Sequence, residues 1–122
     1  MQSVQALKNK ILSLLAAVTL CSAPAFAHHG WSEYDQTKAV TLSGQIESSG
    51  YEHPHGVIQL MTADKKWTVV LAPPFRMENR GLAKQAIAVG QTVTVEGYIN
   101  RRDANELRAE RITASGKTVE LR

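Results

Sequence analysis

Cysteine is almost absent from this 122-residue chain, and its single copy, Cys21, lies near the start. No disulfide can form within the chain, so a stable fold has to rest on packing. A hydrophobic run of membrane-spanning length is also lacking. The apolar stretch at residues 11–20 is about half of the roughly 20 residues that a spanning helix requires. Internal repeats and low-complexity tracts are missing too.

The start of the chain has the pattern of a secretory signal. Lys8 and Lys10 form a positive n-region before the apolar residues 11–20, and Ala25 and Ala27 supply the small residues that a signal peptidase requires. We predict cleavage after Ala27, which makes residues up to that point a signal peptide. The mature protein is then periplasmic or secreted and has no permanent membrane anchor.

Cys21 raises the alternative of a lipid-anchored protein. Lipid attachment requires a small residue directly before the cysteine, and Leu20 is not small. Cleavage after Ala27 would also discard Cys21 and leave the mature chain free of cysteine. The sequence therefore favours a released protein over a lipoprotein.

A strong charge of either sign is also lacking. The formal net charge is +3, but Lys8 and Lys10 leave with the predicted signal while all 11 acidic residues remain. The predicted mature chain keeps 12 of the 14 basic residues against those 11 acidic ones, a balance of +1. A near-neutral exported protein is a poor polyanion binder, so we expect no nucleic acid partner.

Residues 28–38 show no sustained periodicity. We predict an extended arm over this stretch. Large aromatic side chains bury substantial apolar area, so we expect Trp31 and Tyr34 to pin the arm against the following domain.

Alternating apolar and polar residues mark residues 39–122 as a single β domain. The predicted strands are residues 40–47, 57–62, 67–71, 91–100 and 107–114, with a short terminal strand at 118–121. Pro73 and Pro74 stop the third strand, because proline cannot donate to a ladder. A helical connector follows over residues 75–86, interrupted at Gly81.

The order β-β-β-α-β-β is that of an OB-fold, and we predict this all-β fold class, a partly open five-stranded barrel. Gly44 and Gly97 fall inside predicted strands, where a small barrel requires tight bends or bulges. Closure removes the sheet edges that a chain without disulfides would otherwise leave open to aggregation. A small β-sandwich and an SH3-like barrel are the alternative architectures.

Short motifs across the predicted mature chain carry a family resemblance. They are Ala27-His28-His29-Gly30-Trp31-Ser32, Tyr34-Asp35, Pro54-His55, Pro73-Pro74-Phe75-Arg76, Arg80-Gly81-Leu82 and Gly97-Tyr98. In these the chain resembles a family of small exported bacterial proteins known as domain of unknown function 6152. The resemblance implies export, one small β-barrel and a mature chain that starts with histidine, but no established activity. Where the family has Asn-Pro-His, this chain has His53-Pro54-His55. Of these two histidines, only His55 therefore matches the family motif.

All four histidines of the chain lie between positions 28 and 55. After cleavage, His28 would carry a free α-amine beside its imidazole, and both nitrogens can be neutral at or just above neutral pH. The two nitrogens close a compact chelate. A second imidazole, from His53 or His55, completes a three-nitrogen planar set that suits Cu(II), and His29 is a further candidate. The sequence therefore predicts a copper site of the histidine-brace type.

Simpler interpretations compete with a copper site. Two histidines at a chain start bind Cu(II) or Ni(II) weakly in any peptide, and His55 after Pro54 fits a loop histidine that hydrogen-bonds the backbone. A copper redox enzyme would need an open coordination position and a substrate surface. No serine or cysteine nucleophile has a recognisable setting either, so the sequence favours a binding protein over an enzyme.

A metal-free ligand face is the alternative candidate site. In an OB-fold, the loops after the first and fourth strands flank the ligand-binding face. Aromatic rings and guanidinium groups there would bind a peptide, a glycan or an anionic ligand. The candidate residues are Tyr51, Trp67, Tyr98, Arg101, Arg102 and Arg108. The competing interpretation places the aromatics in the core or rim and the arginines on a solvated hairpin tip.

Overall fold

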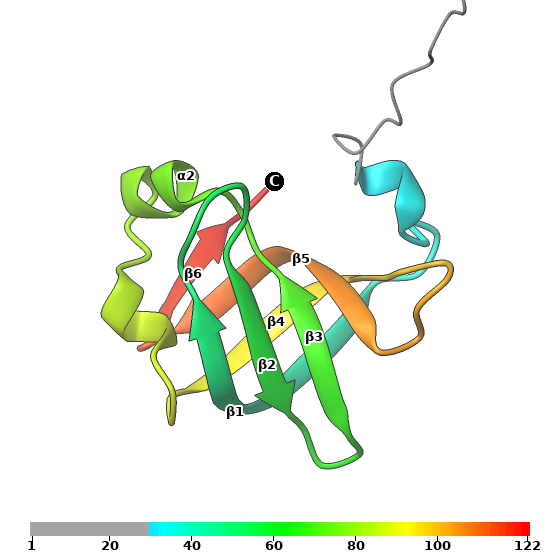
Figure 1. The fold of residues 1–122 in the computed structure, drawn as a ribbon, viewed down its shortest axis with the longest axis horizontal. Coiled ribbons are helices and arrows are strands. Elements are labelled where there is room, and N and C mark those ends of the chain that lie inside the picture. The colour runs from blue at the N-terminus through cyan, green and yellow to red at the C-terminus, as the bar shows by residue number, and fades with distance from the viewer. Residues whose placement is uncertain (1–29) are drawn as a thin grey trace, which may run out of the picture.

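Six strands form one continuous sheet in residues 30–122, the part of the chain that the computed structural model describes (Figure 1). The strands are β1 (Val40–Gly50), β2 (Val57–Met61), β3 (Lys66–Val70), β4 (Thr92–Ile99), β5 (Glu106–Ala114) and β6 (Lys117–Glu120). The predicted signal peptide, together with His28 and His29, lies outside the described residues.

The sheet closes on itself. Its strand order is β3-β2-β1-β4-β5-β6, with antiparallel neighbours, and β3 also pairs with β5 in parallel. The parallel pairing joins Thr68 to Glu106 and Val70 to Arg108, so strands β1 to β5 make a closed barrel and β6 extends β5 outside it. With one short helix between β3 and β4, this is the predicted all-β, five-stranded OB-fold-like barrel.

Two mid-strand glycines allow neighbouring strands to approach closely. A Cβ built on Gly44 would lie 2.1 Å from the carbonyl oxygen of Met61, and one on Gly97 would lie 2.0 Å from the carbonyl oxygen of Arg108. Any side chain at either position would force the backbone apart. The β4–β5 register also shifts beside Gly97, between Glu96 and Gly97, as expected for a bulge in a small barrel.

Strand β1 runs three residues further than the sequence pattern predicts. The prediction ended the strand at Glu47, whereas β1 continues to Gly50 and pairs with β2 as far as Val57. The register shifts between Ile46 and Ser48. A bulge inserts one extra residue, so the alternation of inward and outward side chains is lost at that point and the strand cannot be followed by its period.

The connector after β3 contains two short helical segments, α2 (Pro74–Asn79) and the 3₁₀ turn η2 (Lys84–Ile87). Pro74 starts α2 because its fixed φ suits the first helical position and its missing N–H is not needed there. Gly81, with φ of +86°, ends the first segment in a left-handed turn. Met77, Leu82 and Ile87 point from the connector into the core.

Apolar side chains from every strand and from the connector form one buried core. The buried core comprises Ile46, Ile58, Leu60, Trp67, Val69, Leu71, Ala72, Met77, Leu82, Ile87, Val93, Val95, Leu107, Ala109, Ile112, Ala114, Val119 and Leu121. Trp67, Val69 and Leu71 share one face of the chain, as their spacing predicts. Within residues 30–122, no helix is long and apolar enough to cross a membrane.

Candidate functional site

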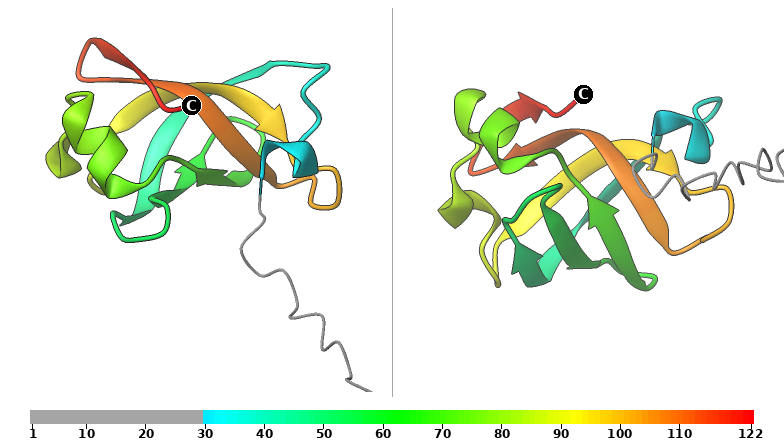
Figure 2. Two further views of the ribbon diagram at one scale, coloured as in Figure 1. Left: turned by 90° about the horizontal axis from the view of Figure 1, so that it is seen from above. Right: turned by 45° about the horizontal axis from the view of Figure 1, so that its top comes forward.

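The arm before β1 pairs with the β4–β5 loop. It contains a short 3₁₀ turn, η1 (Trp31–Glu33), followed by a bridge between Tyr34 and Asn100. The backbone N–H of Asp35 donates to the carbonyl of Ile99 (2.9 Å), and that of Arg101 donates to the carbonyl of Glu33 (2.9 Å). Figure 2 shows the turn beside this loop in both views. The arm and the β4–β5 loop, which are distant in the sequence, therefore lie side by side.

Tyr34 anchors the arm through a buried polar network. Its side chain is 2% exposed, and its hydroxyl donates to Glu106 Oε2 at 3.0 Å. Asn100 Nδ2 donates to the same oxygen at 2.8 Å. Burial raises the pKa of Tyr34 to about 12, and the hydrogen bond to the Glu106 carboxylate acts in the same direction. The tyrosine is therefore a neutral donor that fixes the orientation of a carboxylate.

Trp31 is the second anchor of the arm. The guanidinium carbons of Arg108 and Arg122 lie 4.4 Å and 4.5 Å from the centre of its ring. The Tyr98 ring meets it edge-on, with 6.1 Å between centroids and 80° between planes. We name this group of four residues the Trp31 clamp. Together with Tyr34, the clamp pins the arm to the barrel, in agreement with the expectation from the sequence.

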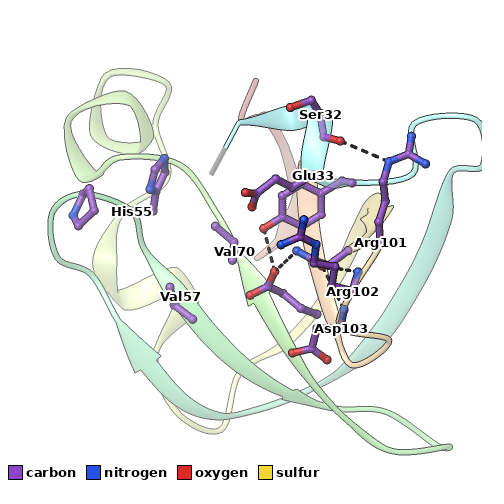
Figure 3. Close-up of a pocket in the computed structure, with 12 residues that line it drawn as sticks. Ser32, Glu33, His55, Val57, Val70, Arg101, Arg102 and Asp103 are labelled. Carbon is purple, nitrogen blue, oxygen red and sulfur yellow. Dashed lines mark hydrogen bonds between the residues drawn. The ribbon is translucent and has the colours of Figure 1, made fainter. Parts of the chain in front are cut away.

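A pocket of about 620 Å³ opens between the arm, the β1–β2 loop and the β4–β5 loop (Figure 3). It is lined by Ser32, Glu33, Tyr34, Pro54, His55, Val57, Val70, Asn100, Arg101, Arg102, Asp103 and Glu106. The loops after β1 and β4 are the ones that flank the ligand-binding face of an OB-fold. The pocket therefore lies where this fold ordinarily binds its ligands.

The pocket wall combines apolar and charged groups. Val57 and Val70 supply apolar surface from β2 and β3. The charged side chains are of both signs: Arg101 and Arg102 on one hand, and Glu33, Asp103 and Glu106 on the other. Arg101 Nε donates to the carbonyl of Ser32 at 3.3 Å, which joins the loop to the arm. This composition suits a small polar ligand or a cation better than a polyanion.

Three of the residues predicted to form a site line this pocket together: His55, Arg101 and Arg102. His53 lies in the same β1–β2 loop and is exposed, but it does not line the pocket. His28 and His29 are outside the described residues. The structure therefore brings one histidine of the predicted metal set together with two arginines of the predicted ligand face.

The aromatic candidates for the ligand face lie away from the pocket lining. Trp67 is 6% exposed and belongs to the core. The Tyr51 hydroxyl donates to the carbonyl of Leu82 at 2.8 Å, and the Tyr98 hydroxyl donates to Glu110 Oε2 at 2.9 Å. Each of these rings thus has a structural contact.

The described part of the chain does not by itself supply a complete metal centre. Between residues 30 and 122, no three His, Cys, Asp or Glu side chains converge as a metal-binding group. His55 is the one histidine of this range that lines the pocket. A copper site that includes His55 would need further nitrogen ligands from outside the pocket lining.

The sequence pattern did not predict most of the polar residues that line the pocket, above all Asn100 and Glu106. Tyr34 and Glu106 are 72 positions apart, and only the bridge between the arm and β4 brings them together. The one available signal was Tyr34 itself, a large aromatic in an otherwise polar arm. Such a side chain has to be buried somewhere, but its partner cannot be read from the local sequence.

A family model described as a family of unknown function (DUF6152) matches residues 16–108. The chain belongs to this family. Membership of DUF6152 confirms the resemblance seen in the short motifs, and it assigns no activity. No curated protein sequence matches the chain.

A solved structure similar to this DUF6152 protein supports the fold alone. It is TiaS in its complex with a transfer RNA and ATP, at 17% identity and a TM-score of 0.50, covering 73% of this chain and 20% of that chain. The S. pombe Stn1–Ten1 complex is also similar, at 20% identity and a TM-score of 0.48, covering 65% of this chain and 59% of that chain. This protein thus spans a fifth of the TiaS chain and about three fifths of the Stn1–Ten1 chain.

Proposed function

We propose that this protein is exported and binds Cu(II) at the rim of the pocket, through His28 at the start of the mature chain and His55 in the β1–β2 loop. The observation that carries the proposal is that His55 lines the same pocket as Ser32 and Glu33. Gly30, where the described chain begins, is two residues after His28. Two residues span about 7 Å at full extension, which is the longest distance that the chain allows between His28 and Gly30.

The donor set fits the metal. The α-amine and the imidazole of His28 form a chelate only after cleavage at Ala27, and His55 adds a third nitrogen. His53 and His29 are further candidate ligands. Nitrogen donors in a planar arrangement are what Cu(II) prefers among common protein ligands. The carboxylates of the pocket wall make it a favourable setting for a cation.

Copper titration of the protein processed at Ala27 tests this proposal. We expect Cu(II) to bind at least about tenfold more tightly than to a synthetic peptide of residues 28–38, because the barrel supplies His55 at a high effective concentration. His28→Ala and His55→Ala should each abolish that advantage. Native mass spectrometry of the envelope protein, without chelators, checks the first residue and the bound metal together. An affinity equal to that of the peptide would exclude a built site.

A metal-free small anion in the same pocket is the second candidate. The observation that favours it is the cavity itself, since a volume of about 620 Å³ with a partly apolar wall falls in the usual range for small-molecule sites. Arg102 is exposed beside the pocket, and Arg101 is oriented by its hydrogen bond to Ser32.

An NMR titration of chelator-treated protein with inorganic phosphate separates the two candidates. If the anion binds, the amide signals of residues 100–106 should shift, and Arg102→Gln should remove the shift while His28→Ala leaves it intact. A silent spectrum together with copper binding would leave the metal site as the function.

A further inference from the structure

Glu106 is held in place at the wall of the pocket. It is the first residue of β5, and Thr68 of β3 is its partner in the parallel pairing that closes the barrel. The backbone N–H of Glu106 donates to the carbonyl of Asp103 at 3.2 Å, and its carbonyl accepts from the N–H of Asn100 at 2.9 Å. Backbone contacts therefore fix the origin of this side chain, which is partly buried and lines the pocket.

One oxygen of the Glu106 carboxylate already has two donors. Oε2 accepts from the Tyr34 hydroxyl at 3.0 Å and from Asn100 Nδ2 at 2.8 Å. The Asn100 amide is fixed in this orientation, because its Oδ1 accepts from the backbone N–H groups of Arg102 (2.8 Å) and Asp103 (3.1 Å). Among the residues that the structure describes, both hydrogen bonds to the carboxylate end on Oε2 and none on Oε1. Oε1 is therefore the acceptor that Glu106 can offer to a ligand.

The rest of the pocket lining favours a cation with an apolar body. Its charged side chains are three carboxylates against two guanidinium groups, which leaves a formal balance of −1. Val57 and Val70 are directly opposite each other on β2 and β3, so their side chains share one face of the sheet. Both valines line the pocket (Figure 3). An apolar surface and an excess of negative charge thus border the same cavity.

We propose that the pocket binds a small primary amine in its protonated form, with the ammonium group on Glu106 Oε1 and the carbon chain over Val57 and Val70. A guanidinium ion makes its strongest contact by donating to both oxygens of a carboxylate at once. Oε2 of Glu106 is already occupied by two donors, so a single oxygen remains, which suits the compact ammonium group. The proposal involves neither copper nor the residues before Gly30, and it goes beyond the metal and the anion candidates.

An NMR titration of the protein with n-butylammonium chloride tests the proposal, with n-butanol and n-butylguanidinium as comparison ligands at the same ionic strength. We expect butylammonium to shift the amide signals of Val57, Asn100 and Glu106 and the side-chain carboxyl carbon of Glu106, and the shifts to saturate. Because n-butanol has the same carbon chain without the charge, it should bind at least about tenfold more weakly. Butylguanidinium should bind about threefold more weakly than butylammonium, since one carboxylate oxygen is closed to it.

Three variants separate the carboxylate from its surroundings. Glu106→Gln keeps an oxygen for the donors of Tyr34 and Asn100 but removes the charge, so it should weaken butylammonium binding at least about tenfold and leave n-butanol binding unchanged. Tyr34→Phe removes one donor from Oε2, so the preference for butylammonium over butylguanidinium should shrink, a change in selectivity that a general loss of structure would not produce. Arg102→Gln removes a cation from the same lining and should strengthen butylammonium binding about twofold.

Saturable binding of butylammonium that moves the carboxyl signal of Glu106 and weakens in Glu106→Gln supports the proposal. Equal binding of n-butanol would show a purely apolar pocket, and unchanged binding in Glu106→Gln would show that the ammonium group lies elsewhere, so either result overturns it. Equal binding of butylguanidinium would contradict the role of a single oxygen. Binding of inorganic phosphate without any binding of butylammonium would also overturn the proposal, and it would favour the anion candidate. The carboxyl signal is measured on the wild type, so the test does not depend on the folding of a variant.

Discussion

The helical connector and the N-terminal arm both cover the barrel, but they are attached by different physics. They lie at opposite ends of the long axis in Figure 1. The connector buries apolar side chains, with Met77 and Ile87 0% exposed. The arm is attached by a hydrogen-bonded tyrosine and by a tryptophan whose ring contacts two guanidinium groups. The apolar attachment fills its end of the barrel, whereas the polar attachment borders a pocket.

We expect this difference to separate effects on stability from effects on ligand binding. Apolar packing is close and non-directional, so the buried side chains of the connector leave no space for a ligand within the core. Directional contacts hold the arm at particular atoms and leave solvent-accessible groups between them, among them Arg102 and Asp103. A site that binds a polar ligand needs such groups. We therefore expect changes in the connector to affect folding, and changes in the arm to affect binding with a smaller effect on folding.

The largest effect should follow from breaking the connector. Met77→Ala removes a fully buried side chain from α2 and should lower the free energy of unfolding by about 2 to 5 kcal/mol. Its neighbour Phe75 is 75% exposed, so Phe75→Ala is a matched control and should change stability by no more than about 0.5 kcal/mol. Denaturant unfolding measures both. Similar losses for the two variants would contradict the role of Met77 in the core.

A smaller effect should follow from breaking the polar anchor of the arm. Tyr34→Phe removes the hydroxyl that donates to Glu106 and should lower the free energy of unfolding by about 1 kcal/mol at pH 8. The measurement is chemical unfolding, with hydrogen exchange at Asp35 and Arg101 to show whether the arm opens locally.

High pH should reverse the order of stability of the wild type and the Tyr34→Phe variant. The pKa of Tyr34 is about 12 when folded and close to 10 when unfolded, so the unfolded chain loses the proton first. The wild type therefore keeps this contribution below pH 10 and loses about 2 to 3 kcal/mol relative to Tyr34→Phe as pH rises to 12. Tyr51 and Tyr98 are present in both proteins, so the effects of their ionisation on stability cancel in the comparison. Parallel stability curves from pH 8 to 12 would show that Tyr34 ionises normally.

The smallest effect should follow from removing one of the two cations of the Trp31 clamp. Arg122→Gln removes one cation from the Trp31 ring and a surface ion pair with Glu110, and it should lower the free energy of unfolding by about 0.5 to 1 kcal/mol. Arg102→Gln is the matched control, because Arg102 is exposed and is not one of the two guanidinium groups at the Trp31 ring. High salt should reduce the difference between the two variants. Equal stabilities at low salt would show that the second cation adds nothing.

The barrel was open to prediction because its signals are local. Alternation in β1 and β4, Pro73 after β3 and Gly81 in the connector each act over a few residues, and together they specify the order of elements. Mid-strand Gly44 and Gly97 indicated closure, and each lies where a neighbouring carbonyl leaves no space for a Cβ. The exception is the end of β1, where a bulge interrupts the period.

The site was only partly open to prediction. The loops after β1 and β4 could be expected to flank a binding face, and His55, Arg101 and Arg102 do line one pocket. The expected aromatic residues do not line this pocket. Trp67 is in the core, and the contacts between cations and an aromatic ring form around Trp31. Nothing near Trp31 in the sequence indicates that Arg108 and Arg122 will be its partners.

By itself, the sequence determined that an all-β barrel with a helical connector would form, because strand period, proline and glycine act on neighbouring residues. Only the tertiary structure decided that the arm folds back onto β4 and β5 and encloses a pocket there. That decision depends on contacts between residues more than 60 positions apart, such as Tyr34 with Glu106, and no local preference encodes the partner of such a contact.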